Sequence, residues 1–502
     1  MNVKKLVCSI ISLSLLVNCG IAALPVSASA VDTDTEIYVS PDGNDSNSGS
    51  SESPFKTLER AKAEVRVHNS NMSGNIIVNI ASGVYYMDNT LEFTQADSGT
   101  NGFSVIYRGI TDENGNSPIV SGGVDISDNW ELYDESLNIY KHENIDWSFR
   151  QLYTNNDRAI RARVPNLENK ETGGPYFRAS GGDGSYPLFI GTNNEYAQKA
   201  GNDAEIIWNS SWSQFRARIE SYNSSTGRVT FKAPDNSFAW NHHTQGDTPF
   251  YLENSLAYLD SEGEWYLDKD TSTLYYKPRE GEIMNKTEII APKLETIIDI
   301  NGTDENKTEN ITFDGIQFLH SNWLAPDSYG YCSVQGGFRY QSEGGKDNSA
   351  IRGSARYDAP KSMVQLRHTK NISLINSEFS FSGSWGIMGY EDTENTVIDH
   401  NVFTKNAGGG VTMGMAGREW DDQTENEQPR TYTDMDGQSR YDTITNNYID
   451  HVACEYQDMV GIGAMLPQHM TIANNEIGYL PYTGINIGWN WLDTDHGMTA
   501  NK

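Results

Sequence analysis

NISLINSEF (residues 371–379) is a phrase that recurs later in the chain, as TVIDHNVF (396–403), TITNNYI (443–449) and TIANNEI (471–477). In each copy apolar residues stand two apart, so their side chains alternate between two faces as in a β-strand. Each copy is followed by a second apolar run that begins with glycine: GIMG (386–389), GVTMG (410–414), GIGA (461–464) and GINIG (484–488). The pattern therefore predicts two strands in every repeat.

The spacing of the repeats indicates how these strands stack. The asparagines of successive phrases, Asn376, Asn401, Asn447 and Asn475, are 25, 46 and 28 residues apart. Two of the steps are close to one coil of a parallel β-helix, and the step of 46 predicts a coil that carries an insertion. A four-stranded propeller blade needs about 40–45 residues. We therefore expect a solenoid, whose coils bury a core by stacking.

An asparagine at the same place in each coil has a functional and a structural interpretation. Stacked amides at a turn hydrogen-bond from coil to coil and tolerate left-handed backbone angles. The structural interpretation is the stronger one for all four asparagines.

The charge of the chain limits its partners. Its 502 residues include 68 acidic and 37 basic side chains, which gives a formal net charge of −31. A field of this sign repels nucleic acid, anionic membranes and polyanionic substrates. A neutral or cationic partner fits better, and we expect the protein to be a monomer that binds no nucleic acid.

Residues 1–30 have the features of a secretory signal peptide. A charged start precedes an apolar run (6–17) that is too short to span a bilayer, and ASA (28–30) provides a small-residue cleavage site. The asparagine before Cys19 disfavours a lipoprotein signal. We therefore predict a secreted, extracellular protein with no membrane association after cleavage.

Only Cys332 and Cys454 remain beyond the predicted cleavage site. Export permits a disulfide between them, but their spacing leaves the pairing open. Two cysteines form neither a disulfide framework nor a zinc site. A large packed core must therefore supply the stability, and we predict no metal site.

The rest of the chain divides into three predicted parts. Residues 31–146 hold a first strand, a helix over 55–67 that caps the open end of the solenoid, and the first coils. Residues 147–288 lose the rhythm and are rich in Trp and Tyr, which predicts a small inserted all-β domain. Residues 289–502 resume the coils.

Two irregular stretches, 322–362 and 418–442, predict loops on one side of the solenoid, where binding faces are commonly built. Within the second, DMDG (434–437) loosely matches the spacing of oxygen ligands for calcium. It lacks the rest of a twelve-residue calcium loop and its closing glutamate. Solvated charge is the favoured interpretation; we predict no cofactor, with calcium as the weaker alternative.

Three groups of segments resemble signatures of secreted β-helix carbohydrate enzymes. They are FRQLYTN (149–155) with RAIRARVPN (158–166), GEWYLD (263–268) with LYYKP (274–278), and GINIGWNW (484–491). Together they resemble glycoside hydrolase family 141, which includes xylan-cleaving and fucose-releasing enzymes. The resemblance implies an all-β fold, a right-handed parallel β-helix with an N-terminal capping helix and an inserted small all-β domain.

The sequence departs from this family at its end. Relatives continue past the GW-x-W phrase with further coils, in which the acids suspected of catalysis lie. This sequence stops at Lys502 without a closing strand, and an uncapped solenoid end is unfavourable. We expect it to be part of a longer protein, in which case the true catalytic pair can lie beyond Lys502 and the chain itself can be inactive.

Hydrolysis of a glycosidic bond needs two carboxyl groups, one acting as acid and the other as base or nucleophile. On a solenoid they would stand on neighbouring coils, which lie about 4.8 Å apart. The candidates in this chain are Glu455 and Asp458, in HVACEYQD (451–458). The competing interpretation is that both carboxylates cap a turn, and it is the stronger one from the sequence alone.

Aromatic residues near the end of the chain are candidates for sugar binding. Trp489, Trp491 and Tyr482 cluster after one coil, and exposed flat rings stack on the apolar faces of sugars. The alternative is that they pack under a loop. His469 could orient a carboxylate or a sugar hydroxyl, although a lone histidine before a strand is more often merely exposed.

The four arginines Arg150, Arg158, Arg161 and Arg163 could suggest an anionic site. In so acidic a chain we expect them instead to pair with nearby Asp157 or Glu168, or to pin the insertion onto the solenoid.

The leading hypothesis is a secreted glycoside hydrolase that acts on plant cell-wall polysaccharide, either xylan or fucosylated side chains of hemicellulose or pectin. It rests mainly on the family resemblance. A polysaccharide lyase on the same scaffold is the first alternative, although its polyanionic substrate would approach a strongly negative protein. A non-catalytic, glycan-binding solenoid is the second.

Overall fold

The computed structural model describes residues 34–169, 173–181, 188–210, 212–232, 247–336, 338–340, 357–358, 360–414, 438–465 and 467–488. Within these residues the regular secondary structure is mainly β-strand, and the helices are short. None of the described helices is long and apolar enough to cross a bilayer. The predicted signal peptide and the acidic segment 434–437 lie outside the described residues.

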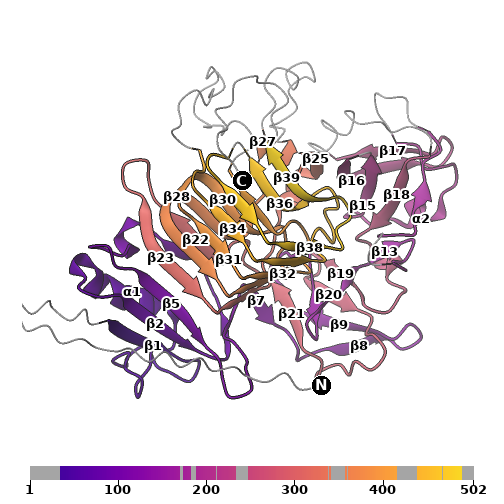
Figure 1. The fold of residues 1–502 in the computed structure, drawn as a ribbon. Helices are drawn as coiled ribbons and strands as arrows, with labels where there is room; N and C mark the ends of the chain where they lie inside the picture. Colours follow the sequence, from indigo (N-terminus) through magenta and orange to yellow (C-terminus); the bar gives the residue numbers. More distant parts are fainter. Residues whose placement is uncertain are drawn as a thin grey trace, which may run out of the picture.

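The largest sheet runs along the whole stack of coils, and its strand pairs are parallel (Figure 1). It has 14 strands: β1 (Thr35–Val39), β2 (Ile76–Ala81), β4 (Leu91–Phe93), β5 (Val105–Ile110), β22 (Ile298–Asn301), β23 (Thr308–Asp314), β28 (Ser362–Ile375), β30 (Trp385–Glu394), β31 (Val397–Asp399), β33 (Val411–Met413), β34 (Thr443–Thr445), β36 (Val460–Met465), β37 (Thr471–Ala473) and β39 (Thr483–Gly488).

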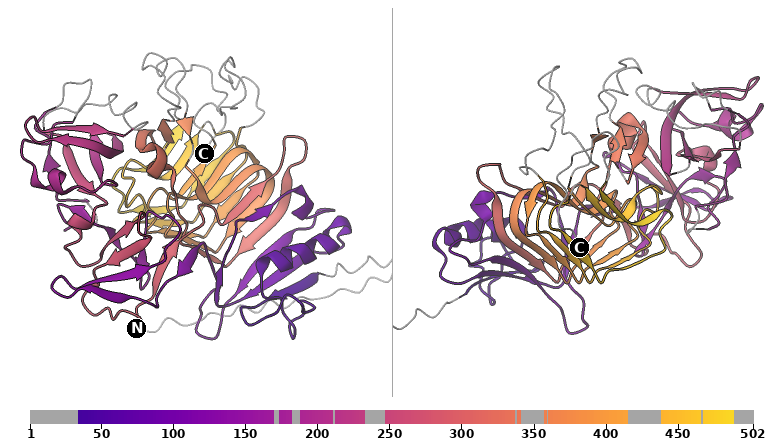
Figure 2. Two further views of the ribbon diagram at one scale, coloured as in Figure 1. Left: turned by 180° about the vertical axis from the view of Figure 1, so that it is seen from behind. Right: turned by 45° about the horizontal axis from the view of Figure 1, so that its top comes forward.

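A second parallel sheet completes each coil. Its seven strands are β3 (Val84–Tyr86), β6 (Ile119–Ser121), β24 (Gln317–Leu319), β29 (Glu378–Ser380), β32 (Val402–Thr404), β35 (Tyr448–Asp450) and β38 (Glu476–Gly478). Each repeat of the sequence pairs with the next one in register: Ile398 lies opposite Leu374 and Ile444. The phrases are thus successive turns of one stack, as the spacing predicted, and the parallel sheets are consistent with a solenoid (Figure 2).

Apolar side chains from both sheets fill one continuous core between them. Phe379 stacks between Phe318 and Phe403, with 5.2 Å between ring centroids on each side. The ladder arises because residues that occupy the same place in successive coils lie one strand spacing apart.

Three of the four asparagines form the expected ladder of side chains. Asn401 Oδ1 accepts from the backbone amide of Ser377 (2.9 Å), and the backbone amide of Asn401 donates to Asn447 Oδ1 (3.0 Å). The backbone amide of Asn447 in turn donates to Asn475 Oδ1 (3.0 Å). Asn376 is one residue out of this register, because Ser377 occupies the ladder position in its coil; its own side chain is exposed and donates to Asp314.

We expect Asn401→Ala to lower the free energy of unfolding by about 2 kcal/mol, because it leaves the buried Ser377 amide and the Leu374 carbonyl without their partner. The midpoint of urea denaturation measures the change. Asn376→Ala is the matched control. It should lower the free energy of unfolding by only about 1 kcal/mol, because alanine is less favourable than asparagine in the left-handed backbone conformation of this position. Equal losses would contradict the ladder.

The N-terminal helix, α1 (Leu58–His68), packs Leu58, Ala61 and Val65 into the core of the stack. It begins later than predicted. Thr57 is its N-cap, accepting from the Arg60 amide (3.2 Å), and the buried Phe55 precedes the helix. The other helical segments among the described residues are α2 (Glu195–Lys199), α3 (Ala325–Tyr329) and the 3₁₀ turns Asn69–Asn71, Gln95–Asp97 and Leu256–Tyr258.

The chain leaves the stack after β6 and rejoins it at β22, and the segment between forms mainly antiparallel sheets. A four-stranded sheet contains β7 (Gly123–Asp125), β10 (Tyr153–Thr154), β11 (Asp157–Arg158) and β21 (Ile289–Pro292). A five-stranded sheet contains β8 (Glu131–Asp134), β9 (Ile139–Glu143), β12 (Ile160–Arg161), β19 (Glu264–Asp268) and β20 (Thr273–Tyr276). The exact domain boundaries given above remain a prediction.

The third of these sheets, with nine strands, also recruits a later segment of the chain. It contains β13 (Arg163–Val164), β14 (Phe177–Arg178), β15 (Glu205–Ser210), β16 (Ser213–Asn223), β17 (Arg228–Phe231), β18 (Pro249–Glu253), β25 (Tyr331–Gln335), β26 (Phe338–Tyr340) and β27 (Tyr357–Asp358). Phe215 of β16 pairs with Cys332 of β25. Described residues of the predicted loop 322–362 therefore extend the sheet of the insertion.

Glu264 is a nearly enclosed carboxyl of the insertion, 1% exposed, and burial raises its pKa to about 8. Because this pKa lies above the unfolded value, the protonated group's contribution to stability is complete below about pH 4 and is lost as the pH rises through about 8. We expect the free energy of unfolding to fall between pH 5 and 6.5 by about 2 kcal/mol more in the wild type than in Glu264→Gln. Urea denaturation at both pH values measures this, and parallel pH profiles would refute the shift.

Candidate active site

The loop 451–459 joins β35 to β36 and carries both candidate carboxyl groups, Glu455 and Asp458. Its backbone is fixed on the neighbouring coil. The amides of Cys454 and Glu455 donate to the carbonyls of Asn406 (3.0 Å) and Ala407 (3.0 Å). The loop is therefore a rigid part of the stack, although its residues have no strand pattern.

Glu455 accepts hydrogen bonds through both carboxyl oxygens. Arg158 Nη1 lies 2.6 Å from Oε1, and Gln151 Nε2 donates to Oε2 over 2.9 Å. The Glu455 side chain is 22% exposed, so it still reaches solvent. Both oxygens of Glu455 are thus held by side-chain donors, which fixes the position of the carboxyl group.

Asp458 lies in different surroundings, among aromatic rings. It is 3% exposed, and its Oδ2 accepts from the hydroxyl of Tyr331 over 2.7 Å. The ring of Tyr456 lies 5.0 Å from that of Tyr331 and 4.8 Å from that of Trp323. The two candidate carboxyl groups thus occupy one loop but contrasting environments, one beside a guanidinium and one beside aromatic rings.

The insertion holds the same loop from the other side. Arg216 Nη2 donates to the Glu455 carbonyl (2.6 Å), and Asn209 Nδ2 donates to Gln457 Oε1 (2.8 Å). The Arg216 guanidinium also lies over the ring of Tyr456, 4.8 Å from its centroid. The loop is therefore clamped between the coil stack and the insertion.

A buried network of ion pairs supports this clamp. Arg150 pairs with Glu205 (2.8 Å) and with Asp327, and Arg161 pairs with Glu205 (3.0 Å). Arg216 pairs with Glu253 (2.7 Å). Burial alone would raise the pKa of Glu205, but the neighbouring guanidinium groups hold it well below its usual range.

Three of the four arginines predicted to pair locally therefore pair over long sequence distances, whereas Arg163 donates to the nearby carbonyls of Pro165, Gly173 and Pro175. Arg158 reaches Glu455, and Arg150 and Arg161 reach Glu205, whereas the expected partners were Asp157 and Glu168. The alternative expectation, that these arginines hold the insertion against the solenoid, agrees with these contacts for Arg158. Local sequence could not identify the partners, because β-sheet pairing brings them together.

Of the four predicted sugar-binding residues, the structure describes two, Tyr482 and His469. Trp489 and Trp491 are outside the described residues. Tyr482 is exposed in the turn between β38 and β39. His469 is half-buried before β37, and its ring stacks on that of Tyr441, 4.9 Å between centroids. The catalytic and sugar-binding roles assigned above remain predictions.

Several residues around the loop were not predicted to contact it. Gln151 and Arg158 contact Glu455, Tyr331 contacts Asp458, and Arg216 holds the loop backbone. Gln151 and Arg158 lie in the two motifs FRQLYTN and RAIRARVPN, so the family resemblance could have pointed to them. Tyr331 and Arg216 lie in neither motif.

Comparison with known proteins identifies the insertion. A family model described as the GH141 insertion domain, in which GH141 denotes glycoside hydrolase family 141, matches residues 137–279. A solved structure named "Glycoside hydrolase" is 26% identical to the chain, with a TM-score of 0.80, and the match covers 93% of this chain and 82% of that one. The chain is a glycoside hydrolase that carries a family 141 insertion domain. No curated protein matches it.

This glycoside hydrolase also shows weaker likenesses. A solved structure named "The complex structure of XylC with xylose" is 12% identical with a TM-score of 0.44, and the match covers 88% of this chain and 58% of that one. A likeness of that size does not bear on function. The stronger match confirms the predicted resemblance and indicates a glycosidase, with carbohydrate as its class of substrate.

Proposed function

We propose that the chain is a secreted, monomeric glycosidase that hydrolyses plant cell-wall polysaccharide, either xylan or fucosylated side chains of hemicellulose or pectin. The observation that carries the proposal is the match to a glycoside hydrolase over 93% of the chain. The GH141 insertion domain supports it, because its strands and loops hold the loop 451–459. The proposal includes the right-handed winding of the coils that the family resemblance implies.

The mechanism that we propose uses the two carboxyl groups of the loop. Glu455, beside the Arg158 guanidinium, is the base or nucleophile. Asp458, enclosed with Tyr331 and Tyr456, is the acid that protonates the leaving oxygen. Paired catalytic carboxyl groups differ in their environments, and the acid is typically the one in apolar surroundings.

The experiment is a reducing-sugar assay of the purified chain on xylan, fucosylated xyloglucan and pectin, with released monosaccharides identified by chromatography. Release of xylose oligomers or fucose supports the proposal. Products with the ultraviolet absorption of an unsaturated uronate would indicate elimination, and hence the lyase alternative. Glycan binding without any turnover would favour the non-catalytic alternative.

A further inference from the structure

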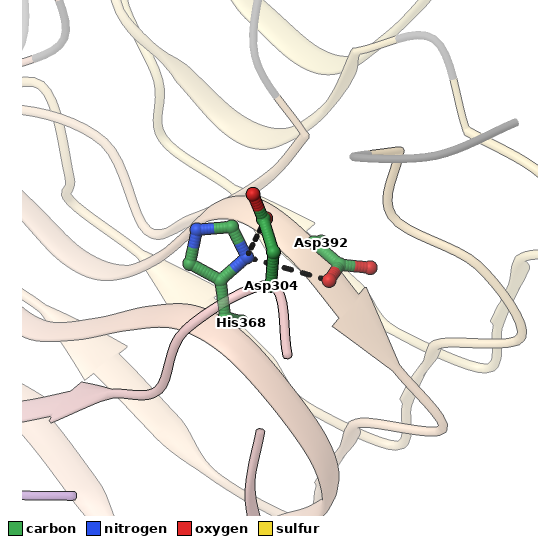
Figure 3. A group of neighbouring side chains, drawn as sticks. All are labelled: Asp304, His368 and Asp392. Carbon is green, nitrogen blue, oxygen red and sulfur yellow. Dashed lines mark hydrogen bonds and ion pairs between the residues drawn. The ribbon is translucent and has the colours of Figure 1, made fainter. Parts of the chain in front are cut away.

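One corner of the coil stack, away from the loop 451–459 in sequence, gathers an imidazole and two carboxyl groups (Figure 3). They belong to Asp304, His368 and Asp392, and one donor atom from each lies within 4.8 Å of the others. Imidazole nitrogen and carboxylate oxygen together are typical ligands of zinc and its transition-metal neighbours. We propose that this corner binds one divalent transition-metal ion, with these three side chains as ligands.

The distances between the donor atoms fit such an ion. His368 Nδ1 is 3.1 Å from Asp304 Oδ1 and 3.4 Å from Asp392 Oδ2. Bonds of about 2.0–2.2 Å to a tetrahedral zinc place neighbouring ligand atoms about 3.3–3.6 Å apart. The two distances from His368 are therefore close to the spacing expected around the ion, and the two aspartate oxygens lie within 4.8 Å of each other.

The fold places two of the ligands before any ion binds. Arg367 pairs with Glu391 and Thr369 with Thr393, so His368 stands opposite Asp392 on the adjacent strands β28 and β30. Both residues have left-handed backbones, with φ of 48° and 49°. Both are also buried, at 8% and 6% exposure. His368 and Asp392 therefore occupy equivalent positions in two adjacent coils, and their side chains lie next to each other.

The third ligand comes from the loop between β22 and β23. The Gly302 amide donates to the Arg367 carbonyl (2.9 Å), and a Cβ at Gly302 would lie 2.3 Å from the His368 carbonyl oxygen. Only glycine allows the loop to approach the strand so closely. Asp304 follows in this loop with its side chain 83% exposed, so the site opens to solvent and leaves room for water as a fourth ligand.

The neighbours of the three ligands orient them. Lys307 Nζ donates to Asp392 Oδ1 (2.7 Å), which leaves Oδ2 directed toward His368. Glu391 Oε2 lies 4.0 Å from His368 Nε2, the ring nitrogen that does not face the proposed ion. A ligating histidine commonly turns its second nitrogen toward a carboxylate. At 4.0 Å this carboxylate lies near the ring but beyond hydrogen-bond distance, and the same oxygen accepts from Arg367 (3.0 Å).

The ligand set also indicates which ions fit. Calcium and magnesium prefer oxygen ligands only, so the imidazole disfavours both. A structural zinc site would usually have cysteines and four protein ligands. We therefore expect zinc, cobalt or nickel, bound as a brace that joins the loop 302–307 to two successive coils. The sequence analysis predicted no metal site, because Asp304, His368 and Asp392 belong to no spaced motif.

The test uses the untagged, full-length chain after dialysis against EDTA, titrated with zinc chloride in a calorimeter at about neutral pH. We expect one ion per chain and a rise in Tm of about 3 °C at a hundredfold excess over Kd. Cobalt should give the visible absorption of a four- or five-coordinate site. Asp304→Asn should weaken binding about tenfold or more without affecting the fold, because that side chain is exposed. His368→Ala should abolish it.

The matched control is His400→Ala. His400 also lies beside a carboxylate, with its Nδ1 2.6 Å from Asp399 Oδ2, but within the described part of the chain no second acid joins this pair to make a group of three ligands. This variant should bind zinc as the wild type does. Zinc binding that is unchanged in both Asp304→Asn and His368→Ala would overturn the proposal. So would the absence of stoichiometric binding in the wild type, which would leave an ion-pair cluster of His368 with its two aspartates.

Discussion

Asp458→Asn is expected to lower kcat/KM on a natural polysaccharide about a thousandfold, which is the size of effect expected when general acid catalysis is lost. Asparagine is close in size to aspartate and can still accept from the Tyr331 hydroxyl, so the loop should keep its structure. The measurement is initial rate against substrate concentration, with circular dichroism to confirm folding. Asp399→Asn, in a repeat of the stack, is the control and should retain activity.

The leaving group separates a catalytic from a structural role. An aryl glycoside with an acidic phenol needs little protonation, so Asp458→Asn should retain most of its activity on that substrate. A disordered loop would instead lose activity on both substrates. Glu455→Gln should lose activity on both because it removes the base or nucleophile. If the wild type is active and Asp458→Asn is equally active on polysaccharide, the glycosidase proposal stands but the assignment of the acid fails.

The architecture of the stack could be predicted from the sequence because a solenoid is built from local repeats. Strands that pair in space are separated by one coil, so the period of phrases such as TVIDHNVF and TITNNYI specifies the register directly. The error at Asn376 shows the limit of that inference. In NISLINSEF the polar residue at the ladder position is Ser377, and pattern alone could not distinguish two adjacent polar residues.

The surroundings of the candidate site could not be predicted in the same way. Glu455 is bonded to Arg158 and Gln151, which are separated from it by 297 and 304 residues. These partners meet because the insertion packs against the stack, and the repeat spacing in the sequence carries no information about that packing. The same holds for Tyr331, which comes from a predicted loop yet contacts Asp458. The motifs contain Gln151 and Arg158 but not Tyr331, and only the structure shows which side chains meet.

The ion pairs beneath the loop lead to the second large expected effect. Arg150→Met should lower the free energy of unfolding by about 3–5 kcal/mol, because it leaves Glu205 buried without its two-pronged partner. The Arg150 side chain is 1% exposed and that of Glu205 4% exposed, so solvent cannot replace the lost guanidinium. Hydrogen–deuterium exchange of peptides from β15 and β16 measures the loss where it arises. Arg60→Met, which removes the more exposed helical pair with Glu64, should cost only about 0.5 kcal/mol.

A second substitution tests whether charge or packing causes that loss. Arg161 still contacts Glu205 in Arg150→Met, but the network then holds one negative charge in excess. Adding Glu205→Gln removes that excess charge and nearly keeps the volume of both side chains, so it should recover at least half of the lost stability. If packing of the arginine stem were the cause, the double variant would be no more stable than Arg150→Met. Because Arg216 belongs to the same network through Glu253 and also holds the Glu455 carbonyl, the double variant should recover activity together with stability. Recovered stability with no recovery of activity would show that Arg150 itself positions the loop.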